Sequence, residues 1–256
     1  MSAKSAALWL LVALLPACAA QPLATPLAAP LAAQESQHQD AATAESWRWS
    51  ATPYLWAAEM EADISAGAVN LDIDIPFSDT LDNLQSAGLV MLAARKGPWT
   101  WMLDNTYLSL DADGSTAGGI PVEVGARLWI AQLNLLHDIT DDGQWQGGLG
   151  VRNLSYQQAV SIGGLPAVRA DKDFTDAVVV GRATRPLNEN WDLVGYADVG
   201  AGDSDLTWQA LASFNYACDD WIIAIGYRVM DYELDSGAVD TDLTLNGPII
   251  GAQFRF

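Results

Sequence analysis

Residues 243–256 read LTLNGPIIGAQFRF, and this C-terminal stretch decides the fold. Counting back in twos from the last residue puts an apolar set on one face of an extended strand: Phe256, Phe254, Ala252 and Ile250. The alternate positions are polar or small: Arg255, Gln253 and Gly251. This period of two predicts a β-strand that continues to the end of the chain with one apolar face. Such an ending is unusual for a water-soluble domain, whose termini commonly fray.

A two-faced strand that ends on an aromatic residue is typical of bacterial outer-membrane β-barrels, in which it serves as an assembly signal. We therefore interpret Phe254 and Phe256 as the signal through which the barrel assembly machinery binds this chain. The same interpretation predicts localisation in the cell outer membrane, with lipid and lipopolysaccharide as neighbours.

The first residues predict export. Residues 1–20 combine Lys4, the apolar run 8–15 (LWLLVALL) and small residues up to Ala20, as a signal peptide does. The sequence leaves open a lipoprotein box at 15–18 (LPAC), in which Cys18 would be lipidated. Residues 21–45 are rich in Ala, Pro, Gln and Ser, which predicts a flexible periplasmic linker, and the barrel domain is expected over 46–256.

The composition excludes several classes of protein. The chain has 12 Lys and Arg against 32 Asp and Glu, and its formal net charge is -20. Nucleic acid is excluded as a partner because phosphate binding needs clustered cations. Half of the residues are hydrophobic, yet after residue 20 no apolar run reaches the roughly 18 residues of a membrane helix. A closed barrel is the other way to satisfy every backbone group in lipid.

Alternating segments separated by turn residues predict an all-β, antiparallel up-and-down barrel of about ten strands, with twelve or eight as alternatives. The expected strands are 47–58, 86–96, 99–110, 124–139, 144–157, 173–185, 190–201, 207–218, 221–234 and 243–256. An even number places both termini in the periplasm, with short inner turns and longer outer loops. Seven tryptophans start the upward strands and predict an aromatic girdle at the periplasmic interface: Trp47, Trp49, Trp99, Trp101, Trp145, Trp191 and Trp221.

Residues 59–85 do not fit this count. The stretch 68–77 (AVNLDIDIPF) resembles a strand, and Ser78 or Asp79 is a candidate N-cap for a short helix. A further spanning strand here would require a partner, which is the twelve-strand alternative. We expect instead an outer loop that folds over or into the mouth of the barrel.

Strand parity predicts which residues face the interior, because successive side chains alternate between lipid and lumen. The interior charged and polar set is Asp104, Arg152, Asp176, Arg182, Asp198, Gln209 and Arg228, together with Gln132 and Asn134. A charge on the lipid face costs about 2–4 kcal/mol near the midplane, which favours the inward assignment. Two interpretations stay open: ion pairs that close the lumen, or a narrow channel whose charges set selectivity.

The sequence predicts no enzyme and no cofactor or metal site. Catalytic dyads in small barrels need a well-placed histidine. His38 falls in the linker, and His137 and Asp138 are adjacent on one strand, so they point to opposite faces. The function expected is a non-enzymatic, monomeric barrel, either structural or a narrow passive channel for small solutes.

Carboxylates concentrate in the expected outer loops, as at Glu61, Asp63, Asp205 and Asp242. This pattern supports an alternative function, a surface binding or adhesion barrel that acts through acidic extracellular loops. It also predicts contact with lipopolysaccharide through divalent cations, because carboxylates are ligands for hard cations.

Several motifs occur in a fixed order: WRWSATPYLWA at 47–57, IPFSDTLDNL at 75–84, AARKGPW at 93–99, FTDAVVVGR at 174–182, GDSDLTWQ at 202–209, IGYRVMDYELD at 225–235 and GPIIGAQFRF at 247–256. Over residues 47–256 the chain resembles a poorly characterised family of small bacterial outer-membrane β-barrel proteins. The resemblance implies fold and location, and it brings no catalytic residues. It also implies a cation at position 196, where this chain has Tyr196.

Overall fold

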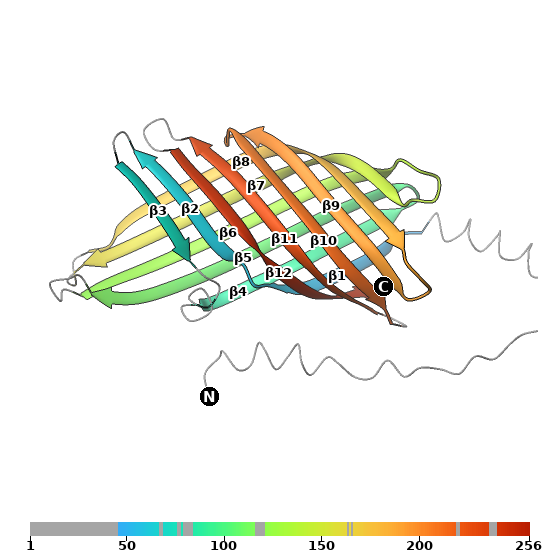
Figure 1. Ribbon diagram of the computed structural model, residues 1–256, viewed down its shortest axis with the longest axis horizontal. Helices are drawn as coiled ribbons and strands as arrows, with labels where there is room; N and C mark the ends of the chain where they lie inside the picture. Colours follow the sequence, from blue (N-terminus) through green and yellow to red (C-terminus); the bar gives the residue numbers. More distant parts are fainter. Residues whose placement is uncertain are drawn as a thin grey trace, which may run out of the picture. The chain divides into compact units, whose positions relative to one another are not determined.

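Figure 1 shows the computed structural model of the chain, a β-barrel whose strands cross the wall obliquely. The structure describes residues 46–66, 69–75, 78, 84–115, 121–162, 164, 166–218, 221–235 and 240–256. The expected signal peptide (1–20), the linker (21–45) and the helix expected after Ser78 lie outside these residues. Among the described residues, no helix has both the length and the apolar content needed to cross a membrane.

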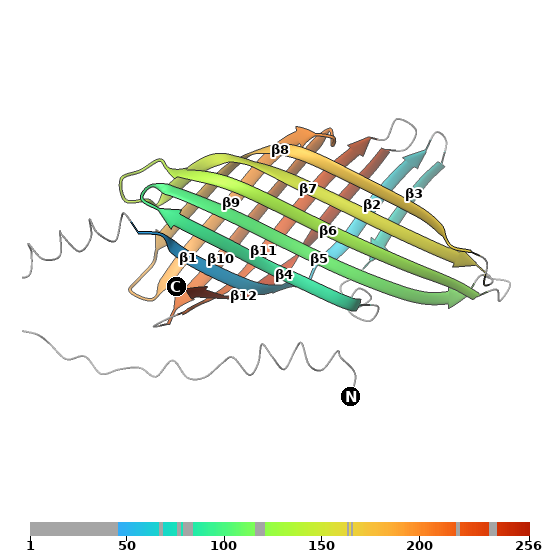
Figure 2. The same ribbon diagram turned by 180° about the vertical axis from the view of Figure 1, so that it is seen from behind.

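The described residues form twelve strands. They are β1 (Arg48–Trp56), β2 (Glu59–Ala66), β3 (Val69–Ile75), β4 (Leu84–Lys96), β5 (Trp99–Ser115), β6 (Pro121–Asp138), β7 (Trp145–Ile162), β8 (Val168–Pro186), β9 (Trp191–Gly202), β10 (Leu206–Ala217), β11 (Trp221–Asp235) and β12 (Asp240–Arg255). Neighbours from β4 to β12 pair in sequence order, and β1 pairs with both β4 and β12. This arrangement closes an antiparallel barrel of ten strand positions and leaves no open edge along the spanning part of the wall (Figures 1 and 2).

The termini of the barrel meet at one end of the wall. The backbone N–H of Trp49 donates to the carbonyl of Phe256 at 2.9 Å, and the N–H of Phe256 donates to the carbonyl of Trp49 at 3.0 Å. Short turns join β4 to β5 and β8 to β9 at this same end. Bacterial outer-membrane barrels carry their short turns and both termini in the periplasm, and we therefore call this end of the wall the periplasmic end.

The β2–β3 hairpin corrects one expectation, because Glu59–Ala66 and Val69–Ile75 form paired strands where an outer loop was expected over 59–85. β1 pairs with the periplasmic half of β12, and β2 continues along its outer half, from Asn246 opposite Glu59 to Asp240 opposite Ser65. The two strands therefore share one position in the wall, and β3 pairs with β2 at the outer end. The chain therefore has twelve strands among its described residues, but the wall of the barrel has ten strand positions. The β2–β3 hairpin does not add a pair of membrane-spanning strands.

The strands on one side of the wall are longer than expected. β5 continues to Ser115, β6 starts at Pro121, β7 continues to Ile162 and β8 starts at Val168, where longer loops were expected at 111–123 and 158–172. The pairing of β5 with β6 and of β6 with β7 extends over this whole length. By contrast β9 ends at Gly202, opposite Asp176, so the outer rim is higher at β5–β8 than at β9 and β10.

The outward face carries the apolar band that lipid requires. Exposed residues on it include Leu133, Leu149, Val179, Phe214 and Ile225. The exposed tryptophans at the periplasmic end are Trp47, Trp49, Trp99, Trp101, Trp145 and Trp191. The first outward acid on β11, Asp231, lies ten positions after Trp221, which at the usual rise and tilt is about 25 Å, the height of a lipid-facing band.

Candidate functional site in the barrel interior

Two ion pairs cross the interior near the middle of the barrel. The guanidinium of Arg152 on β7 pairs with the carboxylate of Asp198 on β9, and both side chains are fully buried. The guanidinium of Arg228 on β11 lies 2.8 Å from the carboxylate of Asp104 on β5. Directly paired residues share a face of the sheet, and β-strand alternation turns all four side chains inward. Each charge is therefore compensated by a partner on another part of the wall.

Two glutamine side chains join these ion pairs into one network. Gln132 accepts a hydrogen bond from Nε of Arg152 at 3.0 Å and donates to Asp198 at 2.9 Å. Gln209 accepts from Nε of Arg228 at 3.0 Å and donates to the same carboxylate at 2.6 Å. Both glutamines thus donate to Oδ2 of Asp198, the carboxylate oxygen that Arg152 does not bind, so the buried carboxylate has hydrogen bonds on both oxygens.

Tyrosine hydroxyls complete the layer. Tyr54 donates to Asp104 at 2.7 Å, and its hydroxyl also accepts from Arg228 at 3.2 Å. Tyr196 donates to Asp198 at 2.7 Å. The resemblance to known barrels implied a cation at position 196, and here the tyrosine hydroxyl meets the carboxylate in its place.

Two of the expected interior charges stand apart from this network. Asp176 accepts hydrogen bonds from the backbone N–H of Ser204 at 2.9 Å and from its hydroxyl. Arg182 lies nearer the periplasmic end and donates to Oε1 of Gln146 at 2.9 Å. Close to it, Arg95 pairs with Asp138 at 2.5 Å. The structure therefore brings Asp104, Arg152, Asp198, Gln209 and Arg228 together and leaves Asp176 and Arg182 in separate places.

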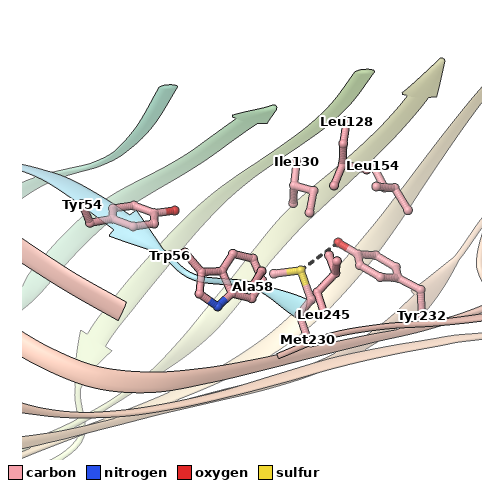
Figure 3. Close-up of a cluster of buried hydrophobic side chains, with 9 residues drawn as sticks. All are labelled: Tyr54, Trp56, Ala58, Leu128, Ile130, Leu154, Met230, Tyr232 and Leu245. Atoms are coloured by element: carbon pink, nitrogen blue, oxygen red, sulfur yellow. Dashed lines mark hydrogen bonds between the residues drawn. The ribbon is translucent and has the colours of Figure 1, made fainter. Parts of the chain in front are cut away.

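An apolar layer lies on the outer side of the ion pairs. Figure 3 shows its nine buried residues, contributed by strands around the wall: Tyr54, Trp56, Ala58, Leu128, Ile130, Leu154, Met230, Tyr232 and Leu245. Met230 and Tyr232 are both 0 % exposed. The Tyr232 hydroxyl contacts the sulfur of Met230 at 3.3 Å (Figure 3). The layer lies directly outward of the ion pairs, because Leu154 follows Arg152 and Met230 follows Arg228 on upward strands.

Two cation–π contacts hold the polar and apolar layers against each other. The Arg228 guanidinium carbon lies 4.8 Å from the ring centroid of Trp56, and that of Arg152 lies 5.7 Å from the ring centroid of Tyr232. An arginine over an aromatic face is attracted by the ring quadrupole, and the attraction grows when water is excluded. The sequence analysis did not identify Trp56 and Tyr232 as interior residues. Parity counted from Arg228 along β11 would have identified Tyr232.

A cavity of about 120 Å³ lies on the other side of the ion pairs. Its lining combines apolar side chains, among them Met102, Val194 and Leu211, with Arg182, Asn134 and Tyr196. Arg228 and Asp104 also line it, so one side of the cavity is the ion-pair layer itself.

Several solved structures have a fold similar to this barrel. The outer-membrane protease OmpT of Escherichia coli matches with a TM-score of 0.53 and 9% identity, over 83% of this chain and 97% of that one. This chain is an outer-membrane β-barrel. Two further similar structures are the Yersinia pestis attachment invasion locus protein Ail, in complex with a heparin analogue, and the Pseudomonas putida toluene transporter TodX. Ail has a TM-score of 0.41 and 10% identity, over 83% of this chain and 99% of Ail. TodX has a TM-score of 0.33 and 10% identity, over 83% of this chain and 90% of TodX.

The similarity to OmpT shows the fold alone, and an identity of 9% carries no residue roles from one barrel to another. No protein-family profile matches the chain, and no curated protein sequence matches it. Function has to be argued from the interior and the surface of this barrel.

Proposed function

We propose that this chain is a non-enzymatic barrel with a closed lumen and a structural role in the outer membrane. The observation that carries the proposal is the stack of two buried layers across the interior. In the polar layer Arg152 and Asp198 are fully buried and paired. In the apolar layer Met230, Tyr232 and Leu154 are at most 1 % exposed. A solute would have to break both layers in succession.

The hydrogen bonding of the buried charges favours a closed lumen over an ion-selective channel. A conducting pore keeps its charged groups in water, so that an ion can exchange its hydration shell for them. Here the carboxylate of Asp198 already accepts hydrogen bonds from Arg152, Gln132, Gln209 and Tyr196. Removing one partner of a buried ion pair costs about 3–5 kcal/mol, so spontaneous opening of the layer is rare.

The placement of His137 supports the non-enzymatic part of the proposal. Its exposed ring faces outward and packs edge-on against Trp99, with 4.5 Å between the ring centroids. Asp138 faces inward, where it binds Arg95 and Gln146. The imidazole is therefore placed as an interfacial side chain, not as a base beside a carboxylate.

Liposome swelling tests the closed lumen. Proteoliposomes with the full-length protein should exclude glucose and glycine as well as protein-free liposomes do. A variant that empties parts of both layers, with Arg152, Asp198, Leu154, Met230 and Tyr232 all changed to Ala, is the positive control, and a variant of the lipid face, Ile225→Ala, is the matched negative one. Swelling of wild-type proteoliposomes above the protein-free rate would support the narrow channel instead.

A second candidate function rests on the outward face of β2, β11 and β12. Asp242 lies directly opposite Glu233 on one side and Asp63 on the other, and all three side chains are exposed. At the next strand, Asp63 is in register with Asp72. Like charges directly opposite each other destabilise a sheet. A compensating cation outside the barrel would relieve this repulsion, which favours a surface that binds lipopolysaccharide phosphates through divalent cations.

This second candidate predicts calcium-dependent binding. Purified lipopolysaccharide should bind the detergent-solubilised protein in calcium and dissociate in EDTA. The substitutions Asp63→Asn and Asp242→Asn should weaken binding, while Asp141→Asn and Glu189→Gln at the periplasmic end should not. Equal binding in calcium and EDTA would reject the cation bridge.

The assembly partner is also part of the proposal. The Phe256 side chain is 75 % exposed although its backbone pairs with Trp49, so an aromatic ring remains accessible at the end of the wall. We expect deletion of Phe256 to reduce the amount of folded protein in the outer membrane of expressing cells, while Arg255→Gln leaves it unchanged. The barrel is proposed to act as a monomer and to belong to the small-barrel family that its sequence resembles.

A further inference from the structure

The periplasmic half of the interior carries one positive charge too many. Arg95 and Arg182 both lie near the single carboxylate of Asp138, and Arg95 occupies it at 2.5 Å. Arg182 donates one hydrogen bond, to the neutral side-chain oxygen of Gln146. Among the described residues, no carboxylate lies within ion-pair distance of Arg182. Arg182 is half-buried, so its charge lacks part of the hydration it would have in water, and an anion that enters beside it would compensate that charge.

Hydrogen-bond donors are in excess at the same place. A guanidinium has five N–H donors and no acceptor. Nε of Arg95 is buried and has no hydrogen-bond partner among the described residues. Gln146 also donates to Asp138, at 2.8 Å, so each carboxylate oxygen of Asp138 already accepts a hydrogen bond from another side chain than Arg182. Two guanidiniums and one carboxylate thus leave donors that an anionic oxygen would satisfy.

Arg182 borders the 120 Å³ cavity, whose walls on the periplasmic side of the ion pairs combine apolar and polar side chains. The apolar walls are Met91, Met102, Val194, Leu211, Ala224 and Ile249. The volume is similar to that of an apolar cavity of about 150 Å³ that takes up benzene, and it equals about four waters at roughly 30 Å³ each. The space therefore suits one small molecule with an apolar part.

The exposure of the lining shows on which side the cavity opens. Residues on the outward side of the cavity, such as Gln132, Gln209 and Arg228, are at most 4 % exposed. Toward the periplasmic end, Asn215 and Gln253 are half-buried, whereas Leu136 and Gln146 are at most 2 % exposed, so the partly open side of the cavity lies along β10 and β12. We call the cavity a vestibule, because this partly open side lies toward the periplasm and the ion-pair layer forms its outward wall.

We propose that this vestibule binds a small monocarboxylate from the periplasm. Arg182 holds the carboxylate by charge-assisted hydrogen bonds, and the apolar part of the ligand packs between Met102 and Val194. An arginine suits this role because its planar fork matches both oxygens of a carboxylate. The site requires no passage through the barrel, so it is independent of whether the lumen conducts.

Benzoate is a suitable probe, since its ring matches the size of the cavity. The experiment is isothermal titration of the full-length, refolded protein in a zwitterionic detergent, with benzamide as the neutral analogue of the same shape. Arg182→Gln removes the cation. The matched control is Arg185→Gln, which removes a guanidinium from an exposed position on the outward face of the same strand. Ala224→Leu fills the cavity from its wall, and heat-dependent gel mobility reports whether each variant is folded.

We expect saturable benzoate binding in wild type and in Arg185→Gln, and at least a roughly tenfold weaker binding in Arg182→Gln, because hydrogen bonds to a charged group contribute about 1.5–3 kcal/mol. Benzamide should not saturate, and Ala224→Leu should abolish benzoate binding. The proposal is overturned if folded wild type shows no saturable benzoate binding, or if Arg182→Gln binds benzoate as tightly as Arg185→Gln does. Tight binding of inorganic phosphate with no benzoate binding would also overturn it, since the apolar wall would then have no role.

Discussion

The guanidinium of Arg228 on β11 lies 2.8 Å from the carboxylate of Asp104 on β5, although β12, β1 and β4 separate these two strands along the wall. The ion pair therefore spans the interior and links distant parts of the barrel. With Arg152 and Asp198 it forms the polar layer of the proposed closed lumen.

Breaking this ion pair on one side should destabilise the barrel strongly. Asp104→Asn leaves the Arg228 charge buried without a counter-charge, which costs about 3–5 kcal/mol. The double variant Asp104→Leu, Arg228→Met removes both charges and should lose less than the single one. Equilibrium unfolding by urea in lipid vesicles measures both. Equal losses in the single and double variants would show that the uncompensated charge is not the cause.

Truncation of the apolar layer should cost stability in proportion to the cavity it leaves. Met230 is 0 % exposed, so Met230→Ala should reduce the free energy of unfolding by about 2–5 kcal/mol. Ile225 lies on the same strand and is 54 % exposed toward lipid, so Ile225→Ala should cost clearly less. The same urea titration compares them. If the lipid-facing variant loses as much, the interior layer is not the better packed of the two environments.

Gly226 allows close approach of β11 to β10 at the inner surface of the wall. A Cβ there would lie 2.3 Å from the carbonyl oxygen of Ala212, whereas at Gly195 nothing lies within 4 Å. Gly226→Ala should therefore cost about 1–3 kcal/mol through overpacking, and Gly195→Ala should fold like wild type. The fraction of folded protein after dilution into detergent, read from gel mobility, distinguishes them. Unimpaired folding of Gly226→Ala would contradict the predicted clash.

The periplasmic turn between β6 and β7 should respond to acid through Asp142. The Thr140 hydroxyl and the backbone N–H of Gln144 donate to its carboxylate, and they hold the pKa of Asp142 below its usual value. A lowered pKa in the folded state stabilises the barrel above the ordinary aspartate pKa of about 3.9, and this contribution is lost as the pH falls through the lowered value. The difference in unfolding midpoint between wild type and Asp142→Ala should therefore be constant from pH 7 to pH 5 and shrink near pH 2. A difference that grows in acid would contradict this sign.

The spanning wall could be predicted from the sequence because each of its strands alternates between lipid-facing and interior residues. Turn chemistry at Gly97-Pro98 and at Asp142-Gly143 marked where strands end. The β2–β3 hairpin could not be predicted in this way. Its outward positions are acidic and its inward face includes the small Ala62, so no apolar band indicates a membrane strand. The position of β2 depends on pairing with β12, which is more than 170 residues away in the chain.

The apolar interior layer was not identified for a related reason. Leu128 and Ile130 face the interior, but the residue between them, Trp129, is 46 % exposed and also apolar. Where both faces of a strand are apolar, composition does not separate them, and only parity counted from Gln132 does. The opposite holds for Asp104 and Arg228, where the cost of a charge in lipid decides the face.

Single-channel recording in planar lipid bilayers tests the closed lumen most directly. With the full-length protein inserted at 1 M KCl, we expect no unitary steps from wild type, and steps from the variant in which Arg152, Asp198, Leu154, Met230 and Tyr232 are changed to Ala. Insertion is verified for both by protection from protease. Bilayers without protein should show no steps. Reproducible steps of uniform size from both the wild-type protein and the Ile225→Ala variant would contradict a closed interior and assign the barrel as a channel.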